Sequence, residues 1–337
     1  MNFPFKDLTF SGDRFRIHGL SADDPYFQML HDNMEPEFTL FCRRYIRPDY
    51  VCLDVGANIG VKSLILAAHA PHGKVVAIEP GPSIGKLLEL NVRTNQAANI
   101  AIERVAVGSQ TGTTVRFVEN SAFGFVGERG DAGDCVADVP MTTLSVFVEK
   151  LGLPRIDFIK IDVEGLEFPI LESSLELINR NDALVYFEFN AWAQMVHTDV
   201  RPREFAQWLL RSFSHVYLVS HFGEFADLLS PVGKDDWLGI LQHNCFTADF
   251  VDDIVVTNAP WRLDAAEAAR STDVLQHNDA LPRRKELVAE RELLRAELAA
   301  LRTERDSARA QLDVLRNSTS WRVTSGLRAI GRVLKSR

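Results

Sequence analysis

A glycine-containing segment follows the first apolar strand of the sequence and carries residues able to bind a ligand. It contains Asp54, Gly56, Asn58 and Gly60 in the order DVGANIG. Glycines let the backbone approach a ligand closely and adopt positive φ angles. The glycine fingerprint of dinucleotide-binding turns is broken here, because Asn58 and Val61 occupy its second and third glycine positions. The carboxylate of Asp54 would repel a pyrophosphate, whereas it suits a ligand with ammonium and sulfonium groups, such as S-adenosylmethionine.

A second acidic residue ends the next predicted strand. Glu79 lies 25 positions after Asp54 and precedes Pro80. A carboxylate at this place accepts hydrogen bonds from the hydroxyl groups of a bound ribose, the usual task of an acid after the second strand. The alternative is a solvated acid at a strand end. Together with the preceding turn, Glu79 predicts a binding site for a nucleoside-containing cofactor.

Two more carboxylates, Asp162 and Glu164, follow a third apolar strand. Alternation along that strand turns Lys160 away from the face that buries its apolar neighbours. Nearby carboxylates repel each other, so one of the pair is expected to have a raised pKa and to act as a base for a hydroxyl group. Oxygen ligands of this kind also bind divalent cations, although nothing else in the sequence supports a metal. In a third interpretation, Asp162 only contacts the cofactor and Glu164 caps the following helix.

A few further polar residues are weaker candidates. Glu188 ends a later strand and is expected at the same edge of the sheet as Asp162 and Glu164. Asn190 follows it and is a weaker candidate still. Among the histidines, His197 is expected to reach an acceptor ahead of His221 and His243. The sequence has no HxH or HExxH spacing, so a metal site built from histidines has little support.

Apolar strands alternate with helical patterns and would position these residues. The predicted strands are Val51–Val55, Lys74–Glu79, Ile100–Val107, Thr113–Glu119, Ile156–Ile161, Ala183–Phe189, His215–Val219 and Ile254–Thr257. The predicted helices are Val61–His69, Ser83–Gln96, Leu166–Ile178 and Arg203–Ser212. The alternation predicts an α/β fold with a mostly parallel sheet and helices on both faces, which binds ligands at the carboxyl ends of its strands. Ser121–Pro140 interrupts the pattern. This segment is either a loop that covers the substrate or an ordinary connecting loop.

Composition and charge limit the class of protein. The 337 residues are 46% apolar and 25% charged, which indicates globular structure and excludes a disordered or collagen-like chain. The four cysteines are far apart, which argues against a zinc site or a disulfide framework. No apolar run approaches the roughly 18 residues of a membrane span, and the first residues lack the apolar stretch of a signal peptide. We therefore expect a soluble, cytoplasmic protein.

Charge divides the chain into an acidic body and a basic end. Residues 1–282 contain 23 basic and 39 acidic side chains, whereas Arg316–Arg337 contains six basic residues and no acid. An acidic body binds nucleic acid poorly, because attraction to phosphate is the main sequence-independent term in such binding. Nucleic acid is therefore not an expected partner.

Residues 283–316 carry a heptad pattern and residues 317–337 a basic one. Apolar residues recur every seven positions, at Leu287, Leu294, Leu301, Ala308 and Leu315. This spacing predicts a coiled coil that forms a homo-oligomer or pairs with another protein, although a single amphipathic helix is an alternative. In the basic tail, the apolar residues that follow Trp321 are spaced so that they share one helical face. Such a helix suits the anionic inner face of the plasma membrane, and a disordered tail is the alternative.

Four motifs taken together resemble one protein family. DVGANIG, AIEPGPS, RVAVGS and IKIDVEGLE are similar in order and spacing to the FkbM-type methyltransferases, over about residues 50–190. The resemblance implies a class I methyltransferase fold, Rossmann-like with a seven-stranded sheet, that binds S-adenosylmethionine and methylates oxygen, commonly in a sugar hydroxyl. It implies that the cofactor is lined by Asp54, Gly56, Asn58, Gly60 and Glu79, with Asp162 a further contact. It also implies that Asp162, Glu164 and Glu188 face the acceptor.

A second, short resemblance concerns the C-terminal part. The segment NSTSWR, residues 317–322, is similar to tails that follow coiled coils in bacterial polysaccharide-assembly glycosyltransferases. The expected organisation is an N-terminal extension (1–45), a methyltransferase domain (46–262), a linker (263–282), a coiled coil (283–316) and a basic tail (317–337). The expected acceptor is a glycan. The alternatives are an NAD-dependent sugar oxidoreductase or epimerase, and a non-catalytic protein of a membrane assembly complex.

Overall fold

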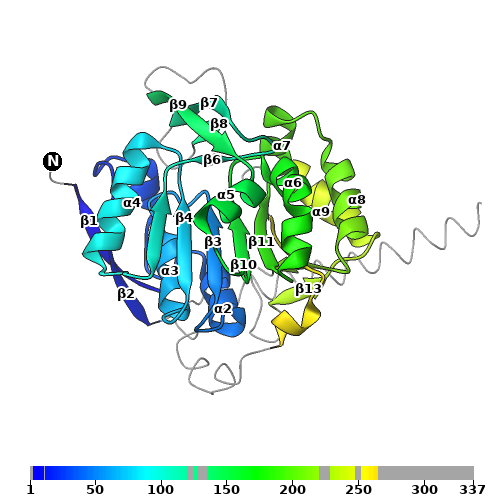
Figure 1. Ribbon diagram of the computed structural model, residues 1–337, viewed down its shortest axis with the longest axis horizontal. Helices are drawn as coiled ribbons and strands as arrows, with labels where there is room; N and C mark the ends of the chain where they lie inside the picture. The colour runs from blue at the N-terminus through cyan, green and yellow to red at the C-terminus, as the bar shows by residue number, and fades with distance from the viewer. Residues whose placement is uncertain are drawn as a thin grey trace, which may run out of the picture. The chain divides into compact units, whose positions relative to one another are not determined.

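The computed structural model describes residues 3–10, 12–119, 124–126, 135–219, 228–246 and 252–264 of the chain (Figure 1). All of them belong to one compact unit, Met1–Arg270. The predicted coiled coil, the predicted basic tail and the predicted linker from residue 265 onward lie outside the described residues.

The centre of the unit is an eight-stranded sheet with the strand order β13-β12-β14-β11-β10-β3-β4-β5. The strands are β3 (Val51–Val55), β4 (Lys74–Ile78), β5 (Ile100–Glu103), β10 (Phe158–Ile161), β11 (Leu184–Phe189), β12 (His215–Val219), β13 (Leu229–Pro231) and β14 (Asp252–Thr257). The five strands from β5 to β11 pair in parallel, and β14 runs antiparallel between β11 and β12. The predicted Rossmann-like α/β fold is confirmed. The sheet has one strand more than the seven expected, namely the short edge strand β13.

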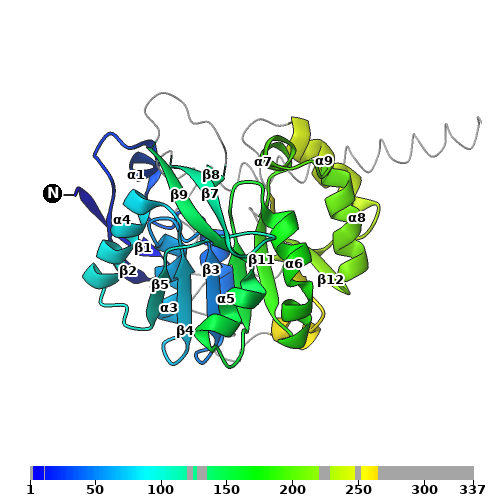
Figure 2. The same cartoon turned by 45° about the horizontal axis from the view of Figure 1, so that its top comes forward.

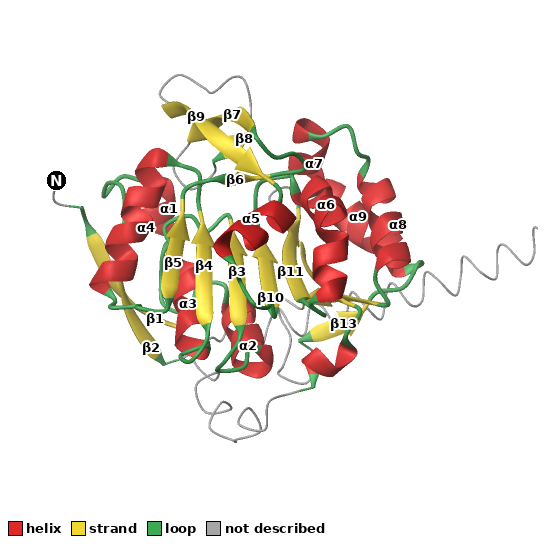
Figure 3. Cartoon of the chain, in the orientation of Figure 1, coloured by secondary structure: helices red, strands yellow, loops and turns green. Residues whose placement is uncertain are grey.

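Helices cover both faces of this sheet, because its central strands are buried on both sides (Figure 3). Leu53 and Val55 of β3 share a core cluster with α5 (Leu144–Leu151), α6 (Glu167–Arg180), α8 (Pro202–Ser212) and α9 (Asp236–Phe246). The opposite face carries α2 (Pro36–Tyr45), α3 (Val61–His69) and α4 (Pro82–Thr94). There Phe41 of α2 contacts the rings of Phe158 and Tyr186. Figure 2 shows α7 (Ala191–His197), α8 and α9 grouped beside β12.

A second, four-stranded sheet is inserted between β5 and α5. Its order is β6-β9-β7-β8, with β6 (Ala106–Val107), β7 (Thr113–Glu119), β8 (Phe125–Val126) and β9 (Cys135–Thr142). The prediction of one strand at Ile100–Val107 is wrong, because β5 and β6 belong to different sheets. Two apolar stretches separated only by Glu103 and Arg104 carry no signal for a change of pairing partner, which explains the error. The predicted interruption at Ser121–Pro140 contains strand residues at 125–126 and 135–140.

The N-terminal extension packs against the main domain. It forms an antiparallel hairpin of β1 (Phe5–Phe10) and β2 (Asp13–His18), followed by α1 (Pro25–Met29) and α2. The fully buried Asn91 of α4 accepts a hydrogen bond from the backbone N–H of His18 at 2.7 Å. Its amide nitrogen donates to the carbonyl oxygens of His18 and Ile59. One buried amide thus joins the hairpin to the turn that precedes α3.

Candidate active site

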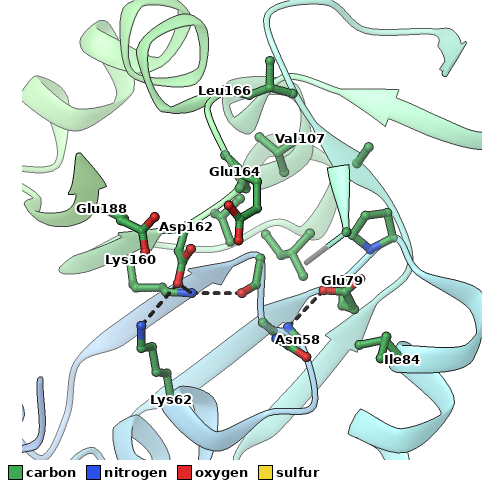
Figure 4. A pocket seen from close by; sticks show the side chains of 18 of the residues that line it. Asn58, Lys62, Glu79, Ile84, Val107, Lys160, Asp162, Glu164, Leu166 and Glu188 are labelled. Carbon is green, nitrogen blue, oxygen red and sulfur yellow. Dashed lines mark hydrogen bonds and ion pairs between the residues drawn. The ribbon is translucent and has the colours of Figure 1, made fainter. Parts of the chain in front are cut away.

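The candidate active site is a cavity at the carboxyl ends of the parallel strands, the place that the sequence analysis predicts for a ligand. The ends of β3, β4, β10 and β11 and the loops after them contribute residues to it. Tyr26 and Glu35 of the N-terminal extension form part of the wall, as do Phe117 and Val126 of the second sheet. The cavity encloses about 1130 Å³ of empty space, part of which is open to solvent. Figure 4 shows many of the side chains that line it.

The turn after β3 forms one edge of the cavity and approaches β10 closely. Gly56 has a φ angle of 76°, and a Cβ atom there would lie 1.8 Å from the backbone oxygen of Asp162. Only glycine fits such an approach. Gly60 and Asn58 also have positive φ angles, 95° and 52°. The positive φ angles expected for the glycines of this turn are confirmed.

Glu79 lies at the end of β4 and is almost fully buried beside this turn. Its carboxylate accepts hydrogen bonds from the backbone N–H groups of Asn58 at 2.9 Å and Gly81 at 2.8 Å (Figure 4). Burial raises the pKa of Glu79 to about 7, against the lowering effect of these two hydrogen bonds. The two backbone donors fix the carboxylate at the cavity wall, and each oxygen retains a lone pair for a ligand.

Asp54 lies behind the cavity wall. Its side chain is fully buried and does not line the cavity. One carboxylate oxygen accepts a hydrogen bond from the Ser63 hydroxyl, and the other lies 3.3 Å from the ammonium nitrogen of Lys160. Asp54 therefore supports the site by holding Lys160, and direct contact with the cofactor remains a prediction.

Asp162 is the centre of an ion-pair network at the charged side of the cavity. Its Oδ2 atom lies 3.2 Å from the Nζ atoms of both Lys160 and Lys62. Lys62 also forms an ion pair with Glu35 at 2.7 Å, and Lys160 donates to the carbonyl oxygen of Gly56 at 2.9 Å. Burial by itself would raise the pKa of Asp162, but the two lysines outweigh it and hold this pKa well below its ordinary value. Asp162 is thus an anion and a weak base.

Glu164 follows two positions later and has the opposite properties. Its backbone is left-handed, with a φ angle of 55°, and its side chain lines the cavity. Among the described residues, its carboxylate has no hydrogen-bond or ion-pair partner. Burial, and then the neighbouring charge of Asp162, raise the pKa of Glu164 to about 8. Glu164 is therefore a carboxyl group suited to accepting a proton near neutral pH.

Glu188 of β11 lies at the same end of the cavity (Figure 4). Its carboxylate is 3.5 Å from the side-chain nitrogen of Asn190, which is itself the N-cap of α7. Burial raises the pKa of Glu188 well above its usual range, and the charges of Asp162 and Glu164 add to this effect. Glu188 and Glu164 are thus the two cavity acids with raised pKa values next to Asp162.

The opposite half of the cavity is apolar. Its walls come from β4, α4, β6, β7 and β8, through Ile78, Pro80, Ile84, Val105, Ala106, Val107, Phe117 and Val126. In Figure 4, Ile84 lies beside Glu79 on the side away from the charged network, whereas Val107 lies near Glu164. Glu79 and its apolar neighbour Ile84 thus lie at one side of the cavity, and the charged network around Asp162 lies at the other (Figure 4).

The structure brings together most of the predicted site residues. Gly56, Asn58, Glu79, Asp162, Glu164 and Glu188 line the cavity, whereas Asp54 and Gly60 do not. The sequence analysis missed Tyr26 and Glu35, and it gave no role to Lys62 or Lys160. A lysine within an apolar strand, as at position 160, could have predicted an ion pair at the site, because a buried ammonium requires a partner.

Other candidates lie elsewhere. His197 ends α7 away from the cavity lining, and burial lowers its pKa. His221 and the side chain of His243 lie outside the described residues. The alternative in which Glu164 caps α6 is wrong, since Leu166 is the N-cap. Instead, Glu167 accepts hydrogen bonds from the backbone of this loop.

The described residues lack two further features. No group of three or more His, Cys, Asp or Glu side chains is arranged there to hold a metal ion. None of the helices in that part of the chain combines the length and the apolar composition needed to cross a membrane.

Comparison with known proteins identifies a related domain. Residues 54–219 match the family model described as the methyltransferase FkbM domain, which supports a methyltransferase of this type. The chain is 28% identical over 151 residues to the methyltransferase sdnD of Sordaria araneosa, covering 36% of this chain and 58% of that protein. It is also 29% identical over 161 residues to the AMB antimetabolite synthetase AmbE of Pseudomonas aeruginosa, covering 37% of this chain and 8% of the synthetase. The chain thus spans less than two thirds of either relative.

The solved structures that this chain resembles include several methyltransferases. The crystal structure of the methyltransferase FkbM from Methylobacillus flagellatus is 16% identical with a TM-score of 0.38, and the alignment covers 63% of this chain and 44% of that one. An S-adenosylmethionine-dependent O-methyltransferase from Thermotoga maritima is 14% identical with a TM-score of 0.35, covering 63% and 60%.

Proposed function

We propose that this chain is an S-adenosylmethionine-dependent O-methyltransferase that acts on a hydroxyl group of a sugar, in a polysaccharide or a glycan precursor. One observation carries the proposal, namely the arrangement of chemical groups in the cavity. S-adenosylmethionine consists of a flat, weakly polar adenine, a ribose diol and a charged amino-acid end. The cavity offers apolar walls and the carboxylate of Glu79 on one side, and the charged network on the other (Figure 4). The residues present therefore fit this cofactor.

Each part of the cavity has a role in holding the cofactor. The apolar half, including Ile84 and Phe117, would bury the adenine ring. Glu79 would accept hydrogen bonds from the ribose hydroxyls with the lone pairs that Asn58 and Gly81 leave free. Gly56 keeps the turn close to β10, which leaves room for the ligand beside it. The bound cofactor supplies an electrophilic methyl group on a positively charged sulfur.

Glu164 is the residue that we assign as the proton acceptor. A hydroxyl oxygen that attacks a methyl group must lose its proton, and a carboxylate within the cavity is able to take it. Asp162 is held as an anion by two lysines, which makes it a weak base. Glu164 has no such partner among the described residues, and its pKa of about 8 matches proton transfer near neutral pH. Glu188 lies beside it and would bind the acceptor.

The carboxylates that line the acidic side of the cavity support a sugar as the acceptor. These carboxylates accept hydrogen bonds, and a sugar presents several hydroxyl donors to them. The polysaccharide context derives from the resemblance of the C-terminal tail to those of polysaccharide-assembly glycosyltransferases. Pairing through the coiled coil and contact with the inner membrane surface through the basic tail belong to the same proposal.

The cofactor is tested by calorimetry on the full chain. We expect S-adenosylhomocysteine, the demethylated product, to bind, and NAD not to bind. Binding of NAD alone would favour the sugar oxidoreductase alternative, and binding of neither ligand would favour a non-catalytic role. For the acceptor, we expect mass spectrometry of surface glycans to show a methylated sugar that disappears when the gene is deleted.

A further inference from the structure

Lys62 presents a cation to the cavity from the first turn of α3. Its ammonium nitrogen lies 2.7 Å from a carboxylate oxygen of Glu35 and 3.2 Å from Oδ2 of Asp162. An ammonium group has three N–H donors. Two of them are directed at these carboxylates, and within the described part of the chain no other oxygen accepts the third. Lys62 therefore has one donor left for a ligand in the cavity.

Asp162 offers a complementary acceptor next to this donor. Both lysines contact its Oδ2 atom, and Oδ1 has no hydrogen-bond partner among the described residues. The side chain keeps 22% of its surface exposed, on the side of the cavity. A donor and an acceptor of opposite charge thus stand side by side at the charged end of the cavity (Figure 4).

The ammonium of Lys62 and the carboxylate of Asp162 together fit a zwitterionic ligand better than a ligand with a single charge. The network joins two ammonium groups, those of Lys62 and Lys160, to three carboxylates, those of Asp54, Asp162 and Glu35. A lone anion would add to the negative charge of this partly buried network, and a lone cation would leave the remaining donor of Lys62 without an acceptor. An amino-acid group adds one charge of each sign and leaves the net charge of the network unchanged.

Building on the proposed function, we infer that Lys62 binds the carboxylate of the amino-acid end of S-adenosylmethionine and that Oδ1 of Asp162 accepts from its ammonium. Glu35 acts as a positioning residue for Lys62. A lysine has a flexible four-carbon side chain, so an ion pair that fixes its end reduces the ordering needed on binding. Glu35 belongs to the N-terminal extension, outside the residues that match the family model. The extension is thus part of the cofactor site.

The test compares two ligands that differ at this end. S-adenosylhomocysteine carries the amino-acid group, whereas 5′-methylthioadenosine keeps only the adenosine and a methylthio group. We expect Lys62→Met to weaken S-adenosylhomocysteine binding at least about 10-fold, the effect of losing a hydrogen bond to a charged group. We expect the same variant to bind 5′-methylthioadenosine as the natural chain does. Lys62→Arg should restore part of the lost affinity, since it keeps the positive charge.

Two further variants sharpen the comparison. Lys74→Met removes an exposed lysine at the opposite edge of the sheet, and we expect no change for either ligand. Glu35→Gln removes a partly exposed ion pair, and we expect about a 2- to 3-fold loss for S-adenosylhomocysteine only. A merely structural role of Glu35 would instead alter the affinity for both ligands alike.

The outcomes separate this inference from the proposed function. Unchanged affinity of Lys62→Met for S-adenosylhomocysteine would overturn the inference, and so would equal losses for both ligands, because they would indicate general damage to the cavity. If the natural chain binds neither ligand, the proposed function fails, and the inference fails with it.

Discussion

Asp162 and Glu164 lie two positions apart in one loop, yet their pKa values are shifted in opposite directions. Burial acts on both carboxyl groups and raises the pKa of each. Lys160 and Lys62 contact Asp162 directly and reverse the effect there. Glu164 is left with the repulsion of Asp162, and its pKa rises to about 8. The loop thus contains one permanent anion and one group that exchanges a proton, a division of roles typical of acid–base sites.

The first prediction concerns Glu164 as the base. Glu164→Gln keeps the size of the side chain and removes its ability to accept a proton. We expect kcat to fall by about 10²- to 10⁴-fold, the usual contribution of a general base. The affinity for S-adenosylhomocysteine should change little. Glu172→Gln, an exposed position on α6, is the matched control and should retain full activity.

The same assignment predicts the pH dependence of the reaction. A base must be unprotonated, so kcat/KM of the natural enzyme should rise with pH and level off above the Glu164 pKa of about 8. This rise should be absent from the residual activity of Glu164→Gln. A variant profile that keeps the same rise would assign the titration to another group, with Glu188 the next candidate.

Glu79 is predicted to determine cofactor affinity. Glu79→Ala removes the proposed acceptor for the ribose hydroxyls, and we expect affinity for S-adenosylhomocysteine to fall about 10- to 100-fold. The change also leaves the N–H groups of Asn58 and Gly81 without their acceptor, so Glu79→Gln serves as a milder second variant. Glu89→Ala, at an exposed residue of α4, should bind normally. Equal affinity in both Glu79 variants would remove the ribose role.

Glu167 is predicted to make stability depend on pH. Burial raises its pKa to about 7, from an ordinary value of 4.5, so the folded state holds its proton more tightly than the unfolded state. This contribution is fully present below about pH 4.5 and is lost as the pH rises through about 7. Glu167→Gln avoids the ionisation and keeps an oxygen for the N–H groups of Val163 and Gly165.

We therefore expect Glu167→Gln to be more stable than the natural chain at pH 8, by at most about 3 kcal/mol, with the advantage vanishing below about pH 5. Thermal unfolding of both proteins at several pH values measures this difference. A constant difference across the pH range would contradict the prediction.

Arg262 is predicted to stabilise the edge of the sheet opposite the cavity. Its guanidinium lies 3.0 Å from Asp157, and both side chains are buried. Arg262→Ala removes the buried partner of Asp157, leaves only an exposed arginine beside that carboxylate, and should lower the free energy of unfolding by about 3 kcal/mol. Arg155 contacts the same carboxylate from an exposed position, and Arg155→Ala should cost about 0–1 kcal/mol. Urea unfolding measures both, and similar losses would count against the buried pair.

Local sequence patterns determined much of the fold. The periodicity of apolar residues predicted β3, α3, β7 and β12 with their observed bounds, because each has a regular pattern and a clear turn on either side. The same periodicity predicted where the strands end, and therefore which acidic residues lie at the strand ends. In a parallel sheet the carboxyl ends meet at one edge, so Glu79, Asp162 and Glu188 were expected to converge, and all three line the cavity.

Tertiary structure alone decided which of these acids are charged and which residues complete the site. Lys62 lies 100 positions before Asp162, and Glu35 comes from the extension, yet the three form one network. Electrostatic interaction depends on distance in space and on burial, and neither quantity follows from distance along the chain. The sequence thus established that carboxylates gather at this edge of the sheet, and the packing of the extension and of α3 determined their protonation.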